Sequence, residues 1–120
     1  MYMRRYEGTL KFPNSGDPTW GLDVQTLIVR EAEIGFSVAS TSREFGAWKV
    51  ESGKPAVRIE DGSFQVKSIW AFQDGVRCSS PWNFVFRIKF EAPGQYIEVF
   101  GELIQDRLSY QFDGELTAIE

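Results

Sequence analysis

The chain has 120 residues and a formal net charge of −4, with 42% hydrophobic, 25% charged and 15% aromatic side chains. This composition excludes a disordered chain and is typical of one folded globule, so residues 1–120 are expected to form a single domain. Basic side chains are scattered, with Arg4-Arg5 as the only adjacent pair, so nucleic acid is not an expected partner.

Alternating polar and apolar residues, the pattern of half-buried strands, recur along the whole chain. The expected strands are 6–12, 22–29, 32–40, 45–51, 56–60, 63–73, 76–79, 82–91, 95–104 and 108–119. Turn-forming residues occupy 13–18, and a bulge or tight reversal is expected near Arg30-Glu31. Asp61-Gly62 and Asp74-Gly75 predict two-residue hairpin turns, because a type I′ turn needs positive φ at both central positions.

Residues 17–29 allow a second interpretation as a helix. Asp17 and Pro18 fit the N-cap and the first helical position, and Trp20 would share a face with three later apolar residues. Gly21 and several β-branched residues disfavour a helix, so a strand is the prediction. Because Trp20 follows a turn-rich loop, its side chain is either partly exposed, as tryptophans of sugar-binding sites often are, or plugs one end of a barrel, which is the interpretation that we favour.

About nine or ten short strands joined by short turns predict an all-β fold. We predict an antiparallel meander that forms a closed or nearly closed β-barrel of about 8–10 strands, with a two-sheet β-sandwich as the alternative. Gly8 and Gly114 lie at matching depth in the first and last expected strands. Glycines inside strands mark bends or close backbone approach, so we infer that these two strands pair and close the sheet.

The clearest alternation lies between Trp82 and Phe90, where every second residue is aromatic or isoleucine. Residues of matching parity in other strands extend this face, and the candidate ligand-binding set is Phe64, Ser68, Trp70, Phe72, Trp82, Phe84, Phe86, Tyr110 and Phe112. A barrel of about eight strands has an interior that side chains fill or that holds one small ligand. The set therefore predicts either a packed aromatic core or a pocket, since both use the same residue types.

Missing residue types exclude several kinds of catalysis. The chain has no histidine, which excludes Ser-His-Asp and Cys-His catalysis and the usual zinc site. No catalytic residue, metal site or cofactor is predicted. Cys78 is the single cysteine and cannot form an internal disulfide, so a reducing compartment, the cytoplasm, is the expected location. No apolar run approaches the roughly 20 residues of a membrane span, so no membrane partner is expected.

Three functions remain open on this sequence. The leading hypothesis is non-catalytic binding of an apolar or aromatic small molecule in the barrel interior. The first alternative is an oligomeric structural or interaction protein with a solid aromatic core. An outer apolar stripe of Val85, Tyr96, Phe100 and Ile104 supports it, because such stripes are typical of subunit interfaces, and a homodimer is expected. The second alternative is an isomerase- or cyclase-like enzyme in which a carboxylate or tyrosine moves a proton.

Overall fold

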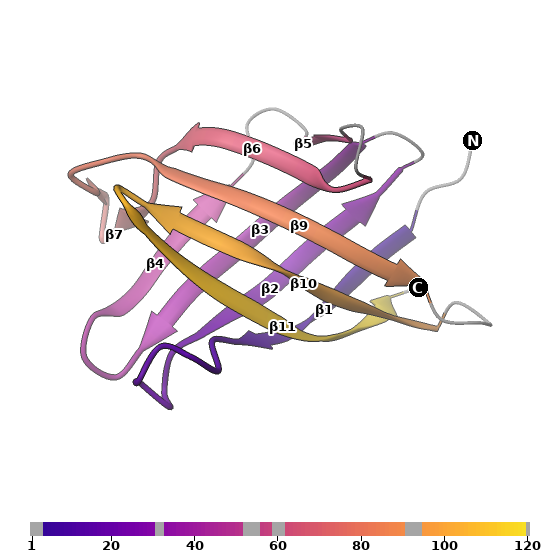
Figure 1. Ribbon diagram of the computed structural model, residues 1–120, viewed down its shortest axis with the longest axis horizontal. Helices are drawn as coiled ribbons and strands as arrows, with labels where there is room; N and C mark the ends of the chain where they lie inside the picture. Colours follow the sequence, from indigo (N-terminus) through magenta and orange to yellow (C-terminus); the bar gives the residue numbers. More distant parts are fainter. Residues whose placement is uncertain (1–3, 31–32, 52–55, 59–61, 91–94, 120) are drawn as a thin grey trace.

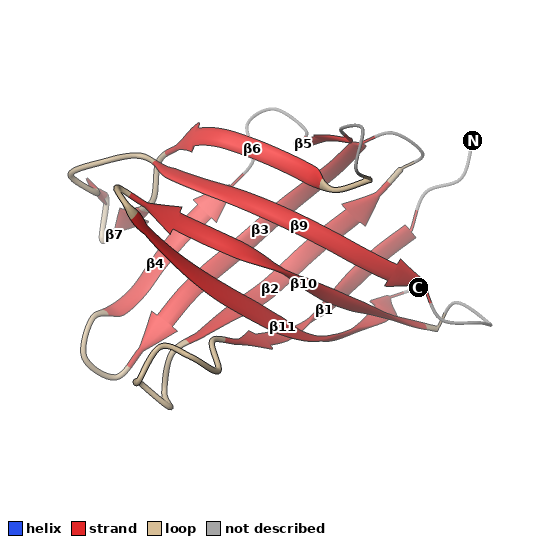
Figure 2. Ribbon diagram, viewed as in Figure 1, coloured by secondary structure: helices blue, strands red, loops and turns tan. Residues whose placement is uncertain are grey.

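The computed structural model describes residues 4–30, 33–51, 56–58, 62–90 and 95–119. Every regular element in these ranges is a strand (Figure 1, Figure 2). The strands are β1 (Arg4–Lys11), β2 (Gly21–Val29), β3 (Glu33–Ser42), β4 (Gly46–Glu51), β5 (Ala56–Arg58), β6 (Phe64–Ile69), β7 (Phe72–Gln73), β8 (Val76–Arg77), β9 (Trp82–Phe90), β10 (Tyr96–Gln105) and β11 (Leu108–Ile119). Among the described residues there is no helix long and apolar enough to cross a membrane.

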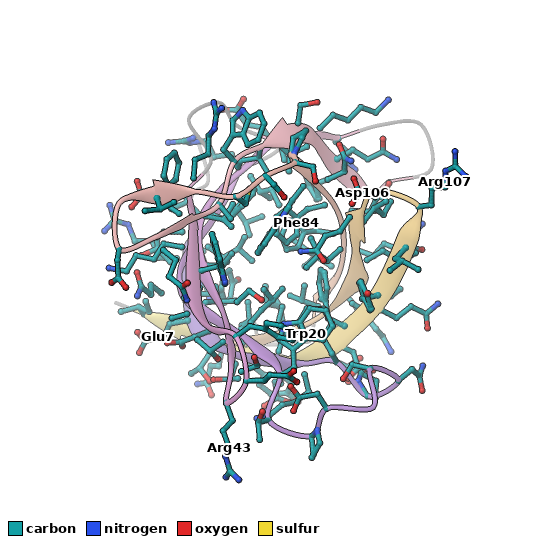
Figure 3. All side chains as sticks on the ribbon, turned by 90° about the vertical axis from the view of Figure 1, so that its left-hand side faces the viewer. Glu7, Trp20, Arg43, Phe84, Asp106 and Arg107 are labelled. Atoms are coloured by element: carbon teal, nitrogen blue, oxygen red, sulfur yellow. The ribbon has the colours of Figure 1, made fainter. Side chains whose placement is uncertain are left out.

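The strands form one antiparallel sheet that curls into a barrel that is nearly, but not fully, closed. Within the described chain, eight strands follow one another around a ring in the order β1, β2, β3, β5, β6, β9, β10 and β11, and β11 pairs with β1. Apart from β4 and the β7–β8 hairpin, which lie outside the ring, and the closing pair β1–β11, neighbours in the ring follow one another in sequence. This is the expected meander barrel, and Figure 3 looks along it from one end.

Closure is incomplete on one side, between β3 and β6. β5 connects them through two residue pairs on each side, which include Val57 with Glu33 and Val57 with Gln65. Farther along β3 the neighbour is β4, which pairs with β7 through Lys49 and Phe72 and not with β6. The barrel is therefore joined at one end of this seam and open at the other.

Glycines allow the first and last strands to approach closely. A Cβ atom on Gly114 would lie 2.9 Å from the backbone oxygen of Thr9, and one on Gly8 would lie 3.1 Å from that of Glu115. Both distances are shorter than ordinary van der Waals contact, so larger residues would push β1 and β11 apart. The pairing of β1 with β11 confirms the inference drawn from these glycines.

Two local predictions are confirmed and two extend beyond the described residues. Residues 17–29 contain no helix, because the chain runs from a loop directly into β2. Asp74 and Gly75 have φ values of 50° and 80°, as the expected hairpin turn requires. The reversal near Arg30-Glu31 and the turn at Asp61-Gly62 each include a residue outside the described part of the chain.

The prediction of one continuous strand over 63–73 is wrong, because β6 ends at Ile69 and its regular pairing with β9 already breaks after Val66. Ser68 has a φ of 58°, in the left-handed region, and the register of β6 against β9 shifts between Val66 and Ile69. Such an irregularity ends the simple alternation, so later side chains leave the inward face. Ser68 and Phe72 are consequently exposed, and Trp70 is half-buried.

Aromatic rings fill the middle of the barrel. The rings of Phe84 and Phe86 stack with centroids 5.6 Å apart, and Phe36 packs against both at 5.7 Å and 5.1 Å. Phe112 closes the group at 5.5 Å from Phe86. Phe84 is completely buried, and Figure 3 shows it inside the ring of strands. The middle of the barrel is thus a packed core, built from the alternation first recognised in 82–90.

Candidate functional site

Two hollows of the described structure are the largest. One, of about 830 Å³, lies on the outer face of β10 and β11 beside Arg87 and Asp113, and its lining is largely charged or polar. The other, of about 600 Å³, lies at one end of the barrel and is more enclosed. We call the second hollow the mouth. Its aromatic wall makes it the better candidate for a ligand site, because small-molecule pockets combine apolar walls with a few polar groups.

The mouth is formed where several loops meet at the left end of the barrel in Figure 1, which faces the viewer in Figure 3. Its aromatic lining residues are Trp20, Phe45, Trp48, Trp82 and Tyr110. Its other lining residues are Ser15, Gly16, Asp17, Ser40, Ser42, Glu44, Gly46, Cys78, Ser79 and Gln105. They come from the 12–20 loop, the β3–β4 turn, the segment before β9 and the β10–β11 hairpin.

Trp20 is held firmly on one side of the mouth. Its ring stacks on Phe12 with centroids 3.8 Å apart, and Tyr110 meets it edge to face at 4.8 Å. Its indole Nε1 donates a hydrogen bond of 2.7 Å to Oγ of Ser40, a buried residue of β3. Trp20 therefore lies at one end of the barrel, as expected, but it forms part of the wall of an open hollow there and does not close that end.

The loop that carries Trp20 is fixed by a local hydrogen-bond network. Oδ1 of Asp17 accepts hydrogen bonds from N and from Oγ1 of Thr19, at 2.9 Å and 2.6 Å. Oγ1 of Thr19 in turn accepts a bond of 2.9 Å from N of Arg43, which ties the loop to the β3–β4 turn. The bonds from Thr19, with a smaller contribution from the charge of Arg43, lower the pKa of Asp17 below its usual 3.8.

Two further indoles form the opposite wall. The rings of Trp48 and Trp82 lie 6.5 Å apart and are inclined at 50°. Trp82 is only 7% exposed, yet its Nε1 has no hydrogen-bond partner among the described residues. Among the described residues, every side-chain nitrogen or oxygen that is fully shielded from solvent has a hydrogen-bond partner. Because the N–H of Trp82 has none, it must be accessible to solvent. Because Trp82 lines the mouth, we infer that its N–H is available to an occupant there.

The thiol of Cys78 lies at the mouth but is occupied by backbone partners. N of Ala71 donates to Sγ at 3.3 Å, and Sγ donates to the carbonyl oxygen of Ser80 at 3.1 Å. A backbone bond of 2.9 Å from N of Cys78 to the oxygen of Ala71 adds to these contacts. They hold the segment around the β7–β8 hairpin against the barrel, which gives Cys78 a structural role.

The structure divides the predicted candidate residues into three groups. Trp82 and Tyr110 line the mouth. Four phenylalanines are buried in the packed core: Phe64, Phe84, Phe86 and Phe112. The remaining three, Ser68, Trp70 and Phe72, lie beyond the irregularity in β6 and do not join the inward face, with Trp70 stacked under Arg77 at 4.1 Å. The candidate location for a pocket is therefore one end of the barrel, because the middle is filled by the four phenylalanines.

Sequence reasoning missed Phe45, Trp48, Ser40 and Gln105 as members of the site. A usable signal was present, because alternate turns of a meander lie at the same end of a barrel. Turns near 13–18, 43–45 and 105–107 are alternate turns in this sense, and aromatic residues flank each of them. Grouping residues by the end at which their turns fall would have predicted this set.

The fold and site define a class of protein, a small antiparallel β-barrel with an aromatic mouth at one end. A comparison with known protein families, curated proteins and solved structures found no match for this chain. Within the part of the chain that the structure describes, no three or more Cys, Asp or Glu residues gather to hold a metal ion.

Proposed function

We propose that this protein binds a small apolar or aromatic molecule at the mouth of the barrel and performs no chemistry on it. The observation that carries the proposal is a hollow of about 600 Å³ walled by five aromatic side chains. That volume falls within the roughly 300–1,000 Å³ typical of small-molecule sites. The packed phenylalanines beneath it provide a rigid floor, so a ligand would meet a largely preformed surface.

The polar groups of the mouth favour a ligand that carries a hydrogen-bond acceptor. The indole N–H groups of Trp48 and Trp82 donate only, and neither has a partner among the described residues. The hydroxyl of Tyr110 and the amide of Gln105 also lack partners there. A carbonyl, ether or ring nitrogen on an aromatic body would satisfy the donors, and burial of the body supplies the affinity.

Titration with an uncharged, environment-sensitive dye such as Nile red tests the proposal. We expect saturable binding that quenches tryptophan fluorescence, and about tenfold weaker binding in Trp48→Ala, because an aromatic contact and its buried area are lost. Trp70→Ala is the matched control, since it removes a tryptophan that does not line the mouth. Circular dichroism checks that both variants fold. Absence of saturable binding, or equal weakening in both variants, would contradict the proposal.

A second function, self-association, is supported by the outer face of β9 and β10. Phe100 is 46% exposed there, between Arg87 and Asp113 on the neighbouring strands, and Tyr96 is exposed on the same strand. An apolar centre flanked by both charges is self-complementary, as a two-fold interface must be. The expected result is a dimer at micromolar concentration by light scattering that Phe100→Glu dissociates and Phe72→Glu does not. A monomeric wild-type protein would exclude this function.

Two further expectations from the sequence concern an enzymatic function and the cellular location. An isomerase-like mechanism needs a buried carboxylate facing the cavity, whereas Asp17 is half-buried and Glu44 is exposed. A cytoplasmic location is proposed because the single cysteine needs no oxidising compartment. Binding without catalysis is therefore the function that we propose.

A further inference from the structure

We propose that the mouth selects ligands whose aromatic body carries a positive charge, as a protonated amine or quaternary ammonium, over anions with the same body. The inference rests on the proposed binding function and adds the chemical class of the ligand. It follows from the charges that line the mouth, from the direction of the nearby cations, and from the aromatic walls between them.

The charged groups that line the mouth are both acidic. Asp17 comes from the 12–20 loop and Glu44 from the β3–β4 turn, and no lysine or arginine is among the described lining residues. The hydrogen bond from N of Arg43 to Oγ1 of Thr19 joins these two loops, so the two carboxylates share one side of the rim. The rest of the lining is neutral, so no cation of the lining itself opposes the two carboxylates, although the charge of Arg43 acts on Asp17 from outside it.

No described cation lines the mouth, although Lys11 lines a smaller neighbouring hollow together with Asp17. Arg43 is the neighbour of Glu44, but Figure 3 shows its side chain extending away from the barrel. Arg107, in the β10–β11 turn, also extends outward in this view. Arg77 lies over the ring of Trp70, outside the mouth, at 4.1 Å. An anionic ligand would therefore meet carboxylates without meeting a guanidinium.

The aromatic walls act in the same direction as the carboxylates. The faces of tryptophan, tyrosine and phenylalanine rings attract cations, and clusters of such rings are known to recognise ammonium groups. Trp48 is half-buried and Phe45 is exposed, so both present ring surface on the side of the mouth that opens to solvent. Because Glu44 is exposed and Asp17 is half-buried, the attraction of these carboxylates for an ammonium group is partly screened by water and salt and adds to that of the rings.

The unpartnered N–H of Trp82 indicates the orientation of such a ligand. Trp82 is 7% exposed whereas Glu44 at the rim is exposed, so we infer that this N–H lies deeper in the mouth than the carboxylates. A donor at that depth favours the acceptor-bearing aromatic body, and the rim favours the positive charge. The two ends of the mouth therefore recognise the two ends of one amphipathic amine.

The charge of Asp17 persists at physiological pH. Hydrogen bonds from Thr19, and less so the charge of Arg43, hold the pKa of this carboxyl below its usual 3.8. Asp17 therefore remains ionised at pH 7, with Oδ1 satisfied by Thr19.

A matched series of probes tests the inference: 1-naphthylmethylamine, 1-naphthylmethanol and 1-naphthoate, which share a ring system and differ in charge. Dissociation constants come from tryptophan fluorescence at pH 7 and low salt. We expect the amine to bind about tenfold more tightly than the carboxylate, with the alcohol between them. In Asp17→Asn/Glu44→Gln we expect the ratio of amine to carboxylate affinity to fall to about threefold or less.

Asp74→Asn/Asp106→Asn is the matched control for this experiment. Both aspartates lie in turns, have positive φ values that asparagine tolerates, and do not line the mouth. The control should keep the wild-type ratio. If the alcohol binds but the amine is not preferred to the carboxylate, the charge inference is overturned and the proposed function stands. If none of the three probes binds, both are overturned.

Discussion

Two tryptophans at the mouth differ in whether their indole N–H has a hydrogen-bond partner within the protein. Trp20 is satisfied by Ser40 and by ring contacts on both Phe12 and Tyr110, so it is a structural part of the wall. Trp82 has ring contacts but an unpartnered N–H, which leaves one polar group for an occupant. The sequence could not distinguish the two roles, since both residues are tryptophans beside turns. The hydrogen bonds in the structure distinguish them.

Ser40→Ala should destabilise the protein by about 1–3 kcal/mol, because it leaves the indole N–H of Trp20 without its partner. Urea unfolding followed by circular dichroism measures the change. Ser109→Ala is the control, since its hydroxyl is exposed and bonds only to Glu102, and it should change stability by less than about 0.5 kcal/mol. An equal loss of stability in the two variants would mean that the hydrogen bond between Ser40 and Trp20 does not stabilise the fold.

Thr19→Val should raise the pKa of Asp17 toward its usual value, because the side-chain hydrogen bond from Thr19 is the largest cause of the lowered pKa. A lowered pKa stabilises the fold above about pH 4, and this contribution disappears as the pH falls through the pKa of the folded state. The variant should therefore lose less stability on acidification. Carbon-detected NMR of the Asp17 carboxyl measures the pKa, and Thr9→Val should leave it unchanged.

At the scale of elements, the sequence predicted strands well where one face is buried throughout. Trp82, Phe84 and Phe86 are buried and the residues between them are not, so the alternation of β9 survives in the structure. The alternation of β6 failed at Ser68, because a left-handed residue and a shifted register against β9 interrupt it. The sequence pattern of 63–73 does not predict this irregularity, because it depends on the pairing of β6 with β9, which is distant in sequence.

Gly101→Ala should destabilise the β9–β10 pairing by about 3 kcal/mol, the upper end of the usual cost of overpacking. A Cβ atom there would overlap the carbonyl oxygen of Val85, which is backbone and cannot turn aside. Gly16→Ala is the comparison, since its φ is 79° and it has nothing nearby, so only the backbone cost of about 1 kcal/mol applies. Urea midpoints measure both. A smaller loss for Gly101 than for Gly16 would refute the steric argument.

At the scale of the whole molecule, an aromatic core fills the middle of the barrel and the mouth lies at one end of it. The ring contacts run from the mouth through Trp82 and Phe84 to Phe86 and Phe112, without a break between binding wall and core. The barrel is open along part of the seam between β3 and β6, where β4 pairs with the small β7–β8 hairpin. The proposed binding wall and the core therefore share the same rings.

Phe84→Ala should lower the free energy of unfolding by about 3–5 kcal/mol, because a completely buried ring is removed from the packed core. Tryptophan fluorescence and far-ultraviolet circular dichroism should report one coincident transition, as expected for a single domain with one core. Phe100→Ala, at an exposed position, should cost far less. A loss below about 1 kcal/mol in Phe84→Ala would indicate an interior that is not closely packed.

The sequence by itself determined the all-β class, the meander, the pairing of the first and last strands, and the buried face of β9. These features follow from the two-residue period of side chains and from turn residues, and both are local. The tertiary structure decided where the core ends and the mouth begins. That boundary depends on the strand register, on the irregularity at Ser68, and on the meeting of loops that carry Trp20, Trp48 and Tyr110. Contacts between distant segments fix these features, and no local pattern records them.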